Sequence, residues 1–338
     1  MPPDRAKITL KDVSKASGVA LITVSRALRQ PETVHADTRA RIHRTIEELG
    51  YVPNLAARSL TSQRSDMVGV VVPVLTSSLF ADFSEGVASV LRANGLQMLL
   101  GVSERSVDHE HEAVRTFIAR QADAIIVTGF THAEPCRTLL SNFAGPVVET
   151  WNLRDEAIDL SVGYSNFDAA VAMTRYLIDK GYRHIAMVGG AFENNDQASD
   201  RHAGFLHAMR QAGLPTPPEN VLAVPNPTTI QSGGELMLSL MKRPNPPEAV
   251  FFQAELPAQG AILACLSEGI RVPEDVAIAG FGDLSLSALL PVPMTTIHIR
   301  AAEIGRRAAE MTLARLRDET AAQQVTDVGF DLKIRKSA

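Results

Sequence analysis

Cysteine is scarce in this chain, with Cys136 and Cys265 as its only two. We identify no second Cys or His at metal-site spacing beside either, so both are expected to be buried, reduced thiols. Long apolar runs are also missing, since no stretch approaches the ~20 residues that a membrane-spanning helix needs. The N-terminus, MPPDRAKITLKDV, lacks the apolar segment of a secretory signal. We therefore expect a cytoplasmic protein.

Positive charge is in deficit overall but concentrated at one end of the chain. The 338 residues carry a net charge of −5 and are enough for two or three domains. Residues 1–62 hold ten basic and six acidic side chains, so this segment is positive by four and the remainder negative by nine. Because phosphate attraction acts locally, a small basic segment can bind DNA although the whole chain is acidic.

Two short helices around a glycine are predicted near the N-terminus. The pattern places one helix at Leu10–Ser17, with Thr9 as its N-cap and Asp12 completing a partial capping box, and a second at Leu21–Leu28. Gly18 provides the break between them, and a third helix is expected from about Ala36 to Leu49. The residues expected in their common core are Leu10, Val13, Ala16, Val24, Leu28, Ile42, Ile46 and Leu49. This pattern fits a helix-turn-helix, although an ordinary αα-corner would share it.

The DNA-binding interpretation is strengthened by motifs that continue to residue 60. They are Thr9–Val13, Gly18-Val19, Thr23–Arg26, Leu49–Asn54, Ala57 and Leu60. Together these residues resemble the lactose/galactose repressor (LacI/GalR) family of transcriptional regulators. The resemblance implies a DNA-binding headpiece at residues 1–61 and an effector-binding, dimerising core at residues 62–338.

The resemblance assigns roles to the second helix. Leu21, Ile22 and Arg26 correspond to residues that read the major groove, and Thr23 and Ser25 to residues that contact phosphate or position the helix. The sequence departs from the family at the helix start, where alanine replaces the usual Ser or Thr cap. Leu21 and Ile22 are apolar, so they can contact thymine methyl groups but cannot donate bidentate hydrogen bonds to bases.

A hinge helix at about residues 54–61 is also implied by the resemblance. Asn54 matches a phosphate-contacting or groove-positioning residue, and Ala57 and Leu60 match hinge residues. Leu60 would be inserted into the minor groove to kink the operator, at a cost of a few kcal/mol of unstacking. So short a helix needs DNA or tertiary contacts to form.

Strands and helices alternate after residue 66. The expected strands are Met67–Val72, Leu96–Val102, Asp123–Thr128, Pro146–Thr150, Ile185–Gly189, Ala249–Gln253 and Val276–Phe281. The expected helices are Phe80–Ala93, Glu110–Arg120, Phe167–Lys180, Ala198–Ala212, Ile230–Met241, Ala258–Glu268 and Ala301–Leu316. This alternation predicts parallel sheets covered on both faces, and its length suits an α/β core of two doubly wound lobes.

The resemblance extends over this core and implies a periplasmic-binding-protein-like fold. It rests on Gly181–Ala186, Arg201–Phe205, Val272–Phe281 and Met294–Ile297. The chain is expected to cross between lobes near Val162, near Pro291–Thr295 and near Gln324. The predicted N-lobe is residues 65–162 and 295–323, and the C-lobe residues 163–291 and 324–334. The helix Ala301–Leu316 lies at a dimer-forming place in the family, which implies a homodimer, with a tetramer also possible.

Effector-binding residues are expected in loops after the strands, where open α/β sheets place ligands. Arg201 matches the family's effector-binding arginine and can grip a carboxylate or adjacent hydroxyls. Leu79 and Phe80 match an apolar wall, although Phe80 could equally be core. Glu149 and Trp151 follow a strand, and Trp151, the single tryptophan, can stack on a sugar or simply pack. No enzymatic activity, cofactor or metal is expected.

Two departures bear on the effector. Ala254-Glu255 replaces a common Asn-Asp pair, and Asp283 lies one position beyond the usual Asp. Glu255 and Asp283 remain candidate effector-binding residues. A neutral sugar held by Asp and Asn is therefore less favoured than an anion. The segment Val162–Ala170, together with Thr131-His132 and Phe281-Gly282, resembles gluconate-type repressors, which implies a sugar acid of the gluconate or ketogluconate class.

Other chemistry is weakly indicated. His109-Glu110-His111-Glu112 lacks the i, i+4 histidine pair of a zinc helix and is interpreted as the solvated first turn of a helix. Gly189-Gly190 follows a strand, but no GxGxxG dinucleotide motif is formed. The alternatives are a sugar-binding transport receptor sensing a neutral sugar, which the helix-turn-helix and the missing signal oppose, and a sugar-acid enzyme, for which no acid–base pair can be assigned.

Overall fold

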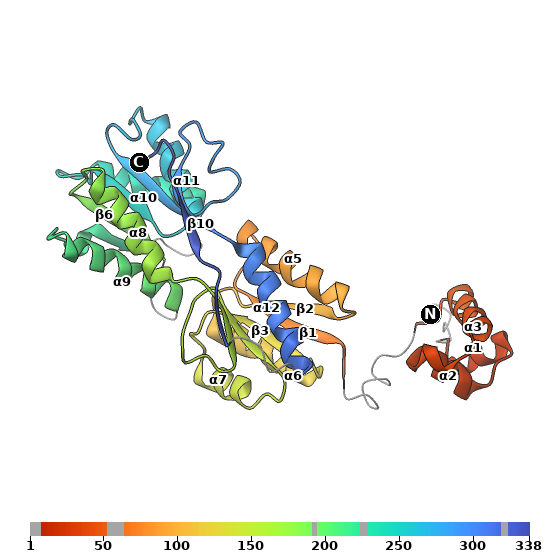
Figure 1. Cartoon of the computed structure of the whole chain (residues 1–338). Coiled ribbons are helices and arrows are strands. Elements are labelled where there is room, and N and C mark those ends of the chain that lie inside the picture. Colours follow the sequence, from red (N-terminus) through yellow and green to blue (C-terminus); the bar gives the residue numbers. More distant parts are fainter. Residues whose placement is uncertain (1–7, 53–63, 191–194, 224–228, 319–323) are drawn as a thin grey trace, which may run out of the picture. The chain divides into compact units, whose positions relative to one another are not determined.

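The chain folds into two compact units, residues 1–65 and 66–338, in a computed structural model (Figure 1). The structure describes residues 8–52, 64–190, 195–223, 229–318 and 324–338. Within these residues no helix combines the length and apolar character needed to cross a bilayer.

The first unit is a small helical bundle. It contains α1 (Leu10–Ser17), α2 (Leu21–Arg29), a short 3-10 helix (Pro31–Thr33) and α3 (Ala36–Leu49). The predicted capping at the start of α1 is present, since both the backbone N–H and the hydroxyl of Thr9 donate to Asp12, at 2.8 and 2.7 Å. Gly18 ends α1 with φ +63°, a left-handed conformation that glycine adopts without strain. The predicted helix-turn-helix is therefore observed.

The core of this unit differs in two places from the predicted apolar face. On α2, Ala27 is buried in the core, whereas the predicted Leu28 is only half-buried and lies outside it. Ala16 is exposed, and Ser17 takes the buried position instead, with its hydroxyl donating to the Ser14 carbonyl. The spacing from Val13 to Ser17 is one helical turn, so the buried face follows i, i+4 rather than i, i+3. The buried apolar residues are Val13, Val19, Val24, Ala27, Val34 and Ile42.

The N-lobe of the second unit is built on a six-stranded sheet in which all paired strands are parallel. Its order is β11-β5-β4-β3-β1-β2. The strands are β1 (Met67–Val72), β2 (Gln97–Val102), β3 (Ala124–Thr128), β4 (Val147–Thr150), β5 (Leu160–Gly163) and β11 (Val325–Asp327). One face packs against α5 (Ser78–Ala93) and α12 (Ala301–Leu316), and the other against α6 (Val107–Ala119) and α7 (Glu134–Ser141).

The C-lobe has a second six-stranded sheet, in the order β12-β10-β9-β8-β6-β7. Its strands are β6 (Ile185–Gly189), β7 (Val221–Ala223), β8 (Ala249–Phe252), β9 (Ala277–Gly282), β10 (Thr295–Ile299) and β12 (Phe330–Lys333), of which only β12 pairs antiparallel in this sheet. One face packs against α8 (Asn166–Asp179) and α9 (Asp196–Gln211), the other against α10 (Ile230–Met241) and α11 (Glu255–Ser267). The expected two doubly wound lobes are thus present.

Two of the three predicted lobe crossings are misplaced along the sequence. The first lies near Val162 as expected, directly after β5. The second falls between Ile299 and Ala301 rather than near residues 291–295, because β10 pairs with β9 of the C-lobe. The third falls between β11 and β12 rather than near Gln324, because β11 pairs with β5 of the N-lobe. These short strands carry no periodicity that shows which sheet they join.

Helix α12 packs closely along α5, and the two lie side by side in Figure 1. A Cβ at Gly86 would lie 2.3 Å from the Ala302 carbonyl oxygen, and one at Gly305 would lie 2.1 Å from that of Phe83. The glycines therefore permit this approach, and the apolar face of α12 is occupied within its own chain.

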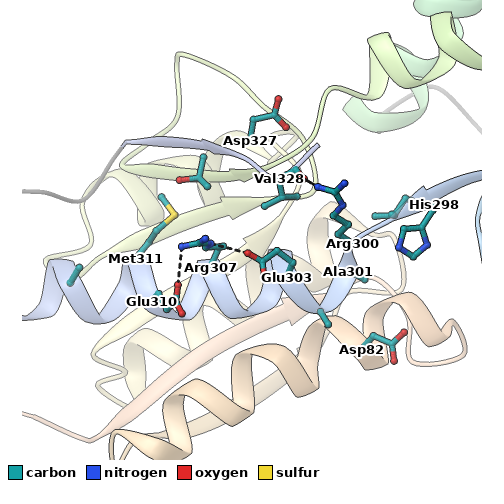
Figure 2. A pocket seen from close by; sticks show the side chains of 14 residues that line it. Asp82, His298, Arg300, Ala301, Glu303, Arg307, Glu310, Met311, Asp327 and Val328 are labelled. Atoms are coloured by element: carbon teal, nitrogen blue, oxygen red, sulfur yellow. Dashed lines mark hydrogen bonds and ion pairs between the residues drawn. The ribbon is translucent and has the colours of Figure 1, made fainter. Parts of the chain in front are cut away.

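The outer face of α12 is charged. Arg307 forms ion pairs with Glu303 at 2.9 Å and Glu310 at 3.4 Å, beside an open groove of about 980 Å³ that Asp327 and Val328 also line (Figure 2). Dimerisation through α12, as predicted, requires this charged face, because the apolar face of the helix is already covered within its own chain.

Candidate functional site

The start of α2 presents an unusual pair of exposed apolar side chains. Leu21 is 39% exposed and Ile22 70% exposed, whereas Val24 and Ala27 on the opposite face are buried. Exposed apolar side chains at a helix start fit contact with thymine methyl groups in a major groove. Ala20 provides no side-chain cap, as predicted from its missing hydroxyl.

The polar residues predicted to contact DNA flank this pair. Arg26 is exposed, and Thr23 and Ser25 are partly exposed, so the five predicted residues of α2 all reach the surface of the unit. Their contact with DNA stays a prediction. Asn54, Ala57 and Leu60 lie outside the described residues.

A cavity of about 420 Å³ lies between the two lobes of the second unit. The residues that line it come from loops at the carboxyl ends of strands and from the helices that follow, where open α/β sheets bind ligands. The predicted effector-binding residues that line it are Leu79, Phe80, Trp151, Arg201 and Glu255.

The N-lobe side of the cavity has an aromatic wall. The Trp151 ring lies 4.7 Å from that of Phe80 and 5.5 Å from that of Phe83, measured between centroids. Trp151 is buried and has φ +73°, a conformation that costs about 1–3 kcal/mol for a non-glycine residue. Its indole Nε1 has no hydrogen-bond partner. The wall therefore offers an apolar surface, and the indole donor behind it has no protein partner.

Arg201 extends from α9 on the C-lobe side. Its terminal guanidinium nitrogen donates to Asn166 Oδ1 at 2.7 Å, and its guanidinium carbon lies 4.7 Å from the centre of the Phe281 ring. Its Nε is buried and unpartnered. Burial lowers the pKa of Arg201, and burial raises the pKa of the neighbouring Tyr164 to about 12. An anion in the cavity would stabilise this buried cation.

Arg105 also lines the cavity, although it was not predicted from the sequence. It follows β2 with φ +62° and is solvent-exposed as a whole residue. The surrounding protein excludes water from the guanidinium and so lowers the pKa of Arg105. The positive charge of Arg201 lowers this pKa further. Two guanidinium groups that repel each other thus face the same cavity. Open α/β sheets bind ligands beyond the carboxyl ends of their strands, so the position of Arg105 after β2 was a signal that could have identified it.

Gln253 is a second lining residue that was not predicted. It follows β8, and its Oε1 is buried without a donor. Three side chains of the lining therefore carry unpaired buried polar atoms: two donors on Trp151 and Arg201, and one acceptor on Gln253. Buried polar groups in folded proteins are normally paired, so these three atoms are exceptions within the residues that surround the cavity.

Glu255 lines the cavity but already has hydrogen-bond partners. The hydroxyls of Ser287 and Thr296 donate to its two carboxylate oxygens, the latter at 2.8 Å. Burial raises the pKa of Glu255 despite these hydrogen bonds. Its capacity to accept hydrogen bonds from a ligand is correspondingly reduced.

Glu149 and Asp283, both predicted to bind effector, do not belong to the cavity lining among the described residues. Glu149 is fully buried, accepting from the Ile158 N–H at 2.6 Å and lying 3.3 Å from His132 Nε2. Asp283 forms ion pairs with Arg335 at 2.7 Å and His298 at 3.1 Å. Each carboxylate is held by protein partners elsewhere in the sequence. The position of a residue after a strand does not reveal such partners.

The comparisons with known proteins agree with both units. Residues 9–54 match the family model of bacterial regulatory proteins of the lacI family, and residues 174–338 that of a periplasmic binding protein-like domain. The chain is 34% identical to the HTH-type transcriptional regulator GntR of Pseudomonas aeruginosa, covering 97% of this chain and 95% of that protein. It is 33% identical to the protein of the same name from Escherichia coli K12, covering 96% of each.

Similarity to a solved structure extends over nearly the whole chain. A LacI-family transcriptional regulator from Silicibacter pomeroyi superposes with a TM-score of 0.90 at 30% identity, covering 98% of this chain and 99% of that one. The chain is therefore a DNA-binding transcriptional regulator of the LacI family, and not an enzyme.

Proposed function

We propose that this regulator is a homodimeric repressor that is released from its operator by a sugar acid of the gluconate or ketogluconate class. The effector binds in the cavity between the lobes, with its carboxylate toward Arg105 and Arg201 and its hydroxyl chain toward Trp151 and Gln253. The gluconate-type motifs of the sequence and the polar groups of the cavity support the same class of ligand.

The observation that carries this proposal is the pair of arginines. Their mutual repulsion in a partly desolvated cavity is relieved by one anionic group, and a guanidinium can bind a carboxylate through two parallel hydrogen bonds. Glu255 is bound by two hydroxyls and Asp283 by Arg335 and His298, so neither carboxylate competes strongly for the arginines. The charges of Asp196 and Asp200 do act on Arg201 and oppose the lowering of its pKa, but both carboxylates also accept hydrogen bonds from Asn152.

The remaining contacts suit a polyhydroxylated chain. Gln253 Oε1 can accept a hydrogen bond from a hydroxyl, and Trp151 Nε1 can donate one. The faces of Phe80 and Trp151 can pack against the C–H groups of the same molecule. A volume of about 420 Å³ is sufficient for a six-carbon acid.

Release from DNA follows from a difference in effector affinity between two arrangements of the lobes. Two copies of the headpiece must meet successive major grooves, which requires a two-fold dimer. Effector binding favours the lobe arrangement that does not suit this spacing, and linkage requires operator DNA to weaken effector binding by the same factor. A ~100-fold change in affinity needs only ~2.7 kcal/mol of coupling.

Titration calorimetry with gluconate and sorbitol tests the effector class, because sorbitol replaces the carboxylate with a neutral CH₂OH group. We expect gluconate to bind roughly 100-fold more tightly, since a charge-assisted pair of hydrogen bonds is lost in sorbitol. Operator release, followed by fluorescence anisotropy, should occur with gluconate alone. Equal affinity for sorbitol or glucose would instead support a neutral-sugar sensor and would reject the sugar-acid effector.

A further inference from the structure

A second cluster of ionisable side chains lies inside the N-lobe, apart from the cavity. The two carboxylate oxygens of Glu110 lie 3.0 and 3.1 Å from Nδ1 of His132, and Glu149 lies 3.3 Å from its Nε2. These residues come from α6, the loop before α7, and β4. Glu110 is buried, so its interpretation as part of a solvated helix turn is wrong.

Cys136 completes this cluster. Its Sγ, a nitrogen of His132 and a carboxylate oxygen of Glu110 all lie within 4.8 Å of one another. The side chain of His132 is fully buried and that of Glu110 is 7% exposed, while Cys136 is buried in the core between α6 and α7. His132 lies four residues before Cys136, in the loop that leads into α7, so the expectation that neither cysteine has a histidine at metal-site spacing is wrong for Cys136.

We propose that Glu110, His132 and Cys136 form a binding site for a divalent transition metal, with zinc as the preferred ion. Zinc combines carboxylate oxygen, imidazole nitrogen and thiolate sulfur in tetrahedral sites, and the fourth position is taken by water. A soft thiolate in the donor set disfavours Mg²⁺ and Ca²⁺, which prefer oxygen ligands alone.

Glu149 supports the site from outside the coordination sphere. Metal-bound histidines commonly donate their second ring N–H to a carboxylate, which fixes the ring orientation and increases the basicity of the ligand nitrogen. With the ion on Nδ1, Nε2–H of His132 donates to Glu149, whose other oxygen is held by the Ile158 N–H. The ion and this carboxylate thus use opposite edges of the ring.

Metal binding leaves the charge of the cluster unchanged. Zn²⁺ displaces the proton from His132 Nδ1 and the thiol proton from Cys136, so one dication replaces two protons. Burial, with a contribution from Glu110, raises the pKa of Cys136 to about 12. Burial alone would lower the pKa of His132, but hydrogen bonds with Glu110 and Glu149 raise it to about 9. The exchange of one dication for two protons therefore adds no net charge to the buried cluster.

The test uses the full chain and compares the two buried cysteines. After refolding with Zn²⁺ and dialysis against metal-free buffer, atomic absorption should find about one zinc per chain. Cys136→Ala and His132→Gln should retain less than about a tenth of this. Cys265→Ala is the matched control, because Cys265 is also a buried thiol but belongs to no ligand cluster in the described part of the chain.

Cobalt gives a second readout, which reports directly on coordination by the thiolate. Co²⁺ added to the protein should produce thiolate-to-metal charge-transfer absorption in the wild type and in Cys265→Ala, and none in Cys136→Ala. Circular dichroism verifies that each variant is folded. Absence of stoichiometric zinc in the wild type, or retention of zinc and of the cobalt band by Cys136→Ala, would overturn the proposal.

Discussion

Asn166 Oδ1 accepts a hydrogen bond of 2.7 Å from the guanidinium of Arg201. The Nδ2 of the same amide donates to the backbone carbonyl of Trp151 at 2.9 Å. Arg201 belongs to the C-lobe, Trp151 follows β4 of the N-lobe, and Asn166 is fully buried between them. A shift of Arg201 toward a ligand therefore changes a hydrogen bond that reaches the strained backbone of Trp151.

Replacing Asn166 with alanine should weaken effector binding more than tenfold. The change leaves the Arg201 nitrogen and the Trp151 carbonyl without their partner, and each unpaired buried group costs about 1–3 kcal/mol. Calorimetry with gluconate and thermal unfolding would measure both effects on the same sample.

The matched control is Asn220→Ala, which removes a buried asparagine whose Nδ2 has no partner and which lies outside the cavity lining. This variant should keep the wild-type affinity for gluconate. If Asn166→Ala loses stability but binds gluconate as tightly as Asn220→Ala, Asn166 is only a structural residue.

Arg105→Gln tests whether the second arginine contributes to recognition of the effector's charge. We expect a loss of at least ~1.4 kcal/mol, or about tenfold, in gluconate affinity, and little change for any weak binding of sorbitol. The dependence of gluconate affinity on salt concentration should also decrease, because one cation has been removed. Arg137→Gln, at an exposed arginine of α7, is the control. A similar loss in both variants would show a non-specific effect of net charge.

Much of the fold could be predicted because long elements carry strong periodicity. The strand Met67–Val72 and the helices Ile230–Met241 and Ala301–Leu316 have the predicted bounds. The strands β5, β7, β10, β11 and β12 and the helix α7 were not predicted. They are three to eight residues long, too short for a period of two or 3.6 to emerge, and pairing with distant strands determines them.

The candidate site was only partly predictable for a related reason. Position after a strand identified Trp151, and the resemblance to the repressor family identified Arg201. Whether a carboxylate after a strand faces the cavity depends on partners far away in the sequence. Asp283 is held by Arg335, and Glu149 by His132, and neither partner is implied by any local pattern.

Asp200 links the lobes beside the cavity, and its removal should weaken effector binding. Its carboxylate accepts from Asn152 at 2.7 Å and from Arg154 at 2.6 Å, both in the loop after β4, whereas Asp200 lies on α9. Arg154 is 39% exposed, so solvent screening limits the pair to about 1 kcal/mol or less. For Asp200→Ala we therefore expect about a fivefold decrease in gluconate affinity by calorimetry.

The control for Asp200→Ala is a variant that removes an ion pair within a single lobe. Asp275 pairs with Arg271 inside the C-lobe, so Asp275→Ala removes a charge without loosening a contact between lobes. This variant should bind gluconate with wild-type affinity. Equal affinity in the two variants would mean that the contact between lobes does not contribute to effector binding.

Glu255 should make anion binding depend on pH. Burial raises its pKa above the ordinary value, opposed by hydrogen bonds from Ser287, Thr296 and the backbone of Asp283, while the Asp283 charge raises it further. An anion bound in the cavity adds like charge and raises this pKa again. Between the two pKa values, binding takes up a proton, so gluconate affinity should increase as pH falls through the range between them.

The variant Glu255→Gln removes the titrating group and keeps the size of the side chain. It should show a flatter pH profile than the wild type, measured by calorimetry between pH 5 and pH 8, and bind gluconate more tightly wherever Glu255 of the wild type is ionised. A profile that is unchanged by the substitution would assign the pH dependence to another group.

A substitution at Ile22 tests whether the exposed face of α2 contacts DNA bases. Because it is 70% exposed, Ile22→Ala should change headpiece stability by less than about 0.5 kcal/mol. The buried neighbour gives the opposite result: Val24→Ala should destabilise the headpiece by about 2 kcal/mol. With an operator selected from random DNA, Ile22→Ala should lose about 1 kcal/mol of specific affinity, consistent with loss of an apolar contact to one thymine methyl group.

A double-mutant cycle identifies the base contacted by Ile22. Replacing each operator thymine with uracil removes only its methyl group, so one such replacement should weaken binding of the wild type but have no effect on Ile22→Ala. The cycle cancels changes in headpiece stability and in phosphate attraction, which are common to both DNAs. If every uracil substitution costs the same in the two proteins, Ile22 does not contact a thymine methyl group, and its exposure must be explained by another partner.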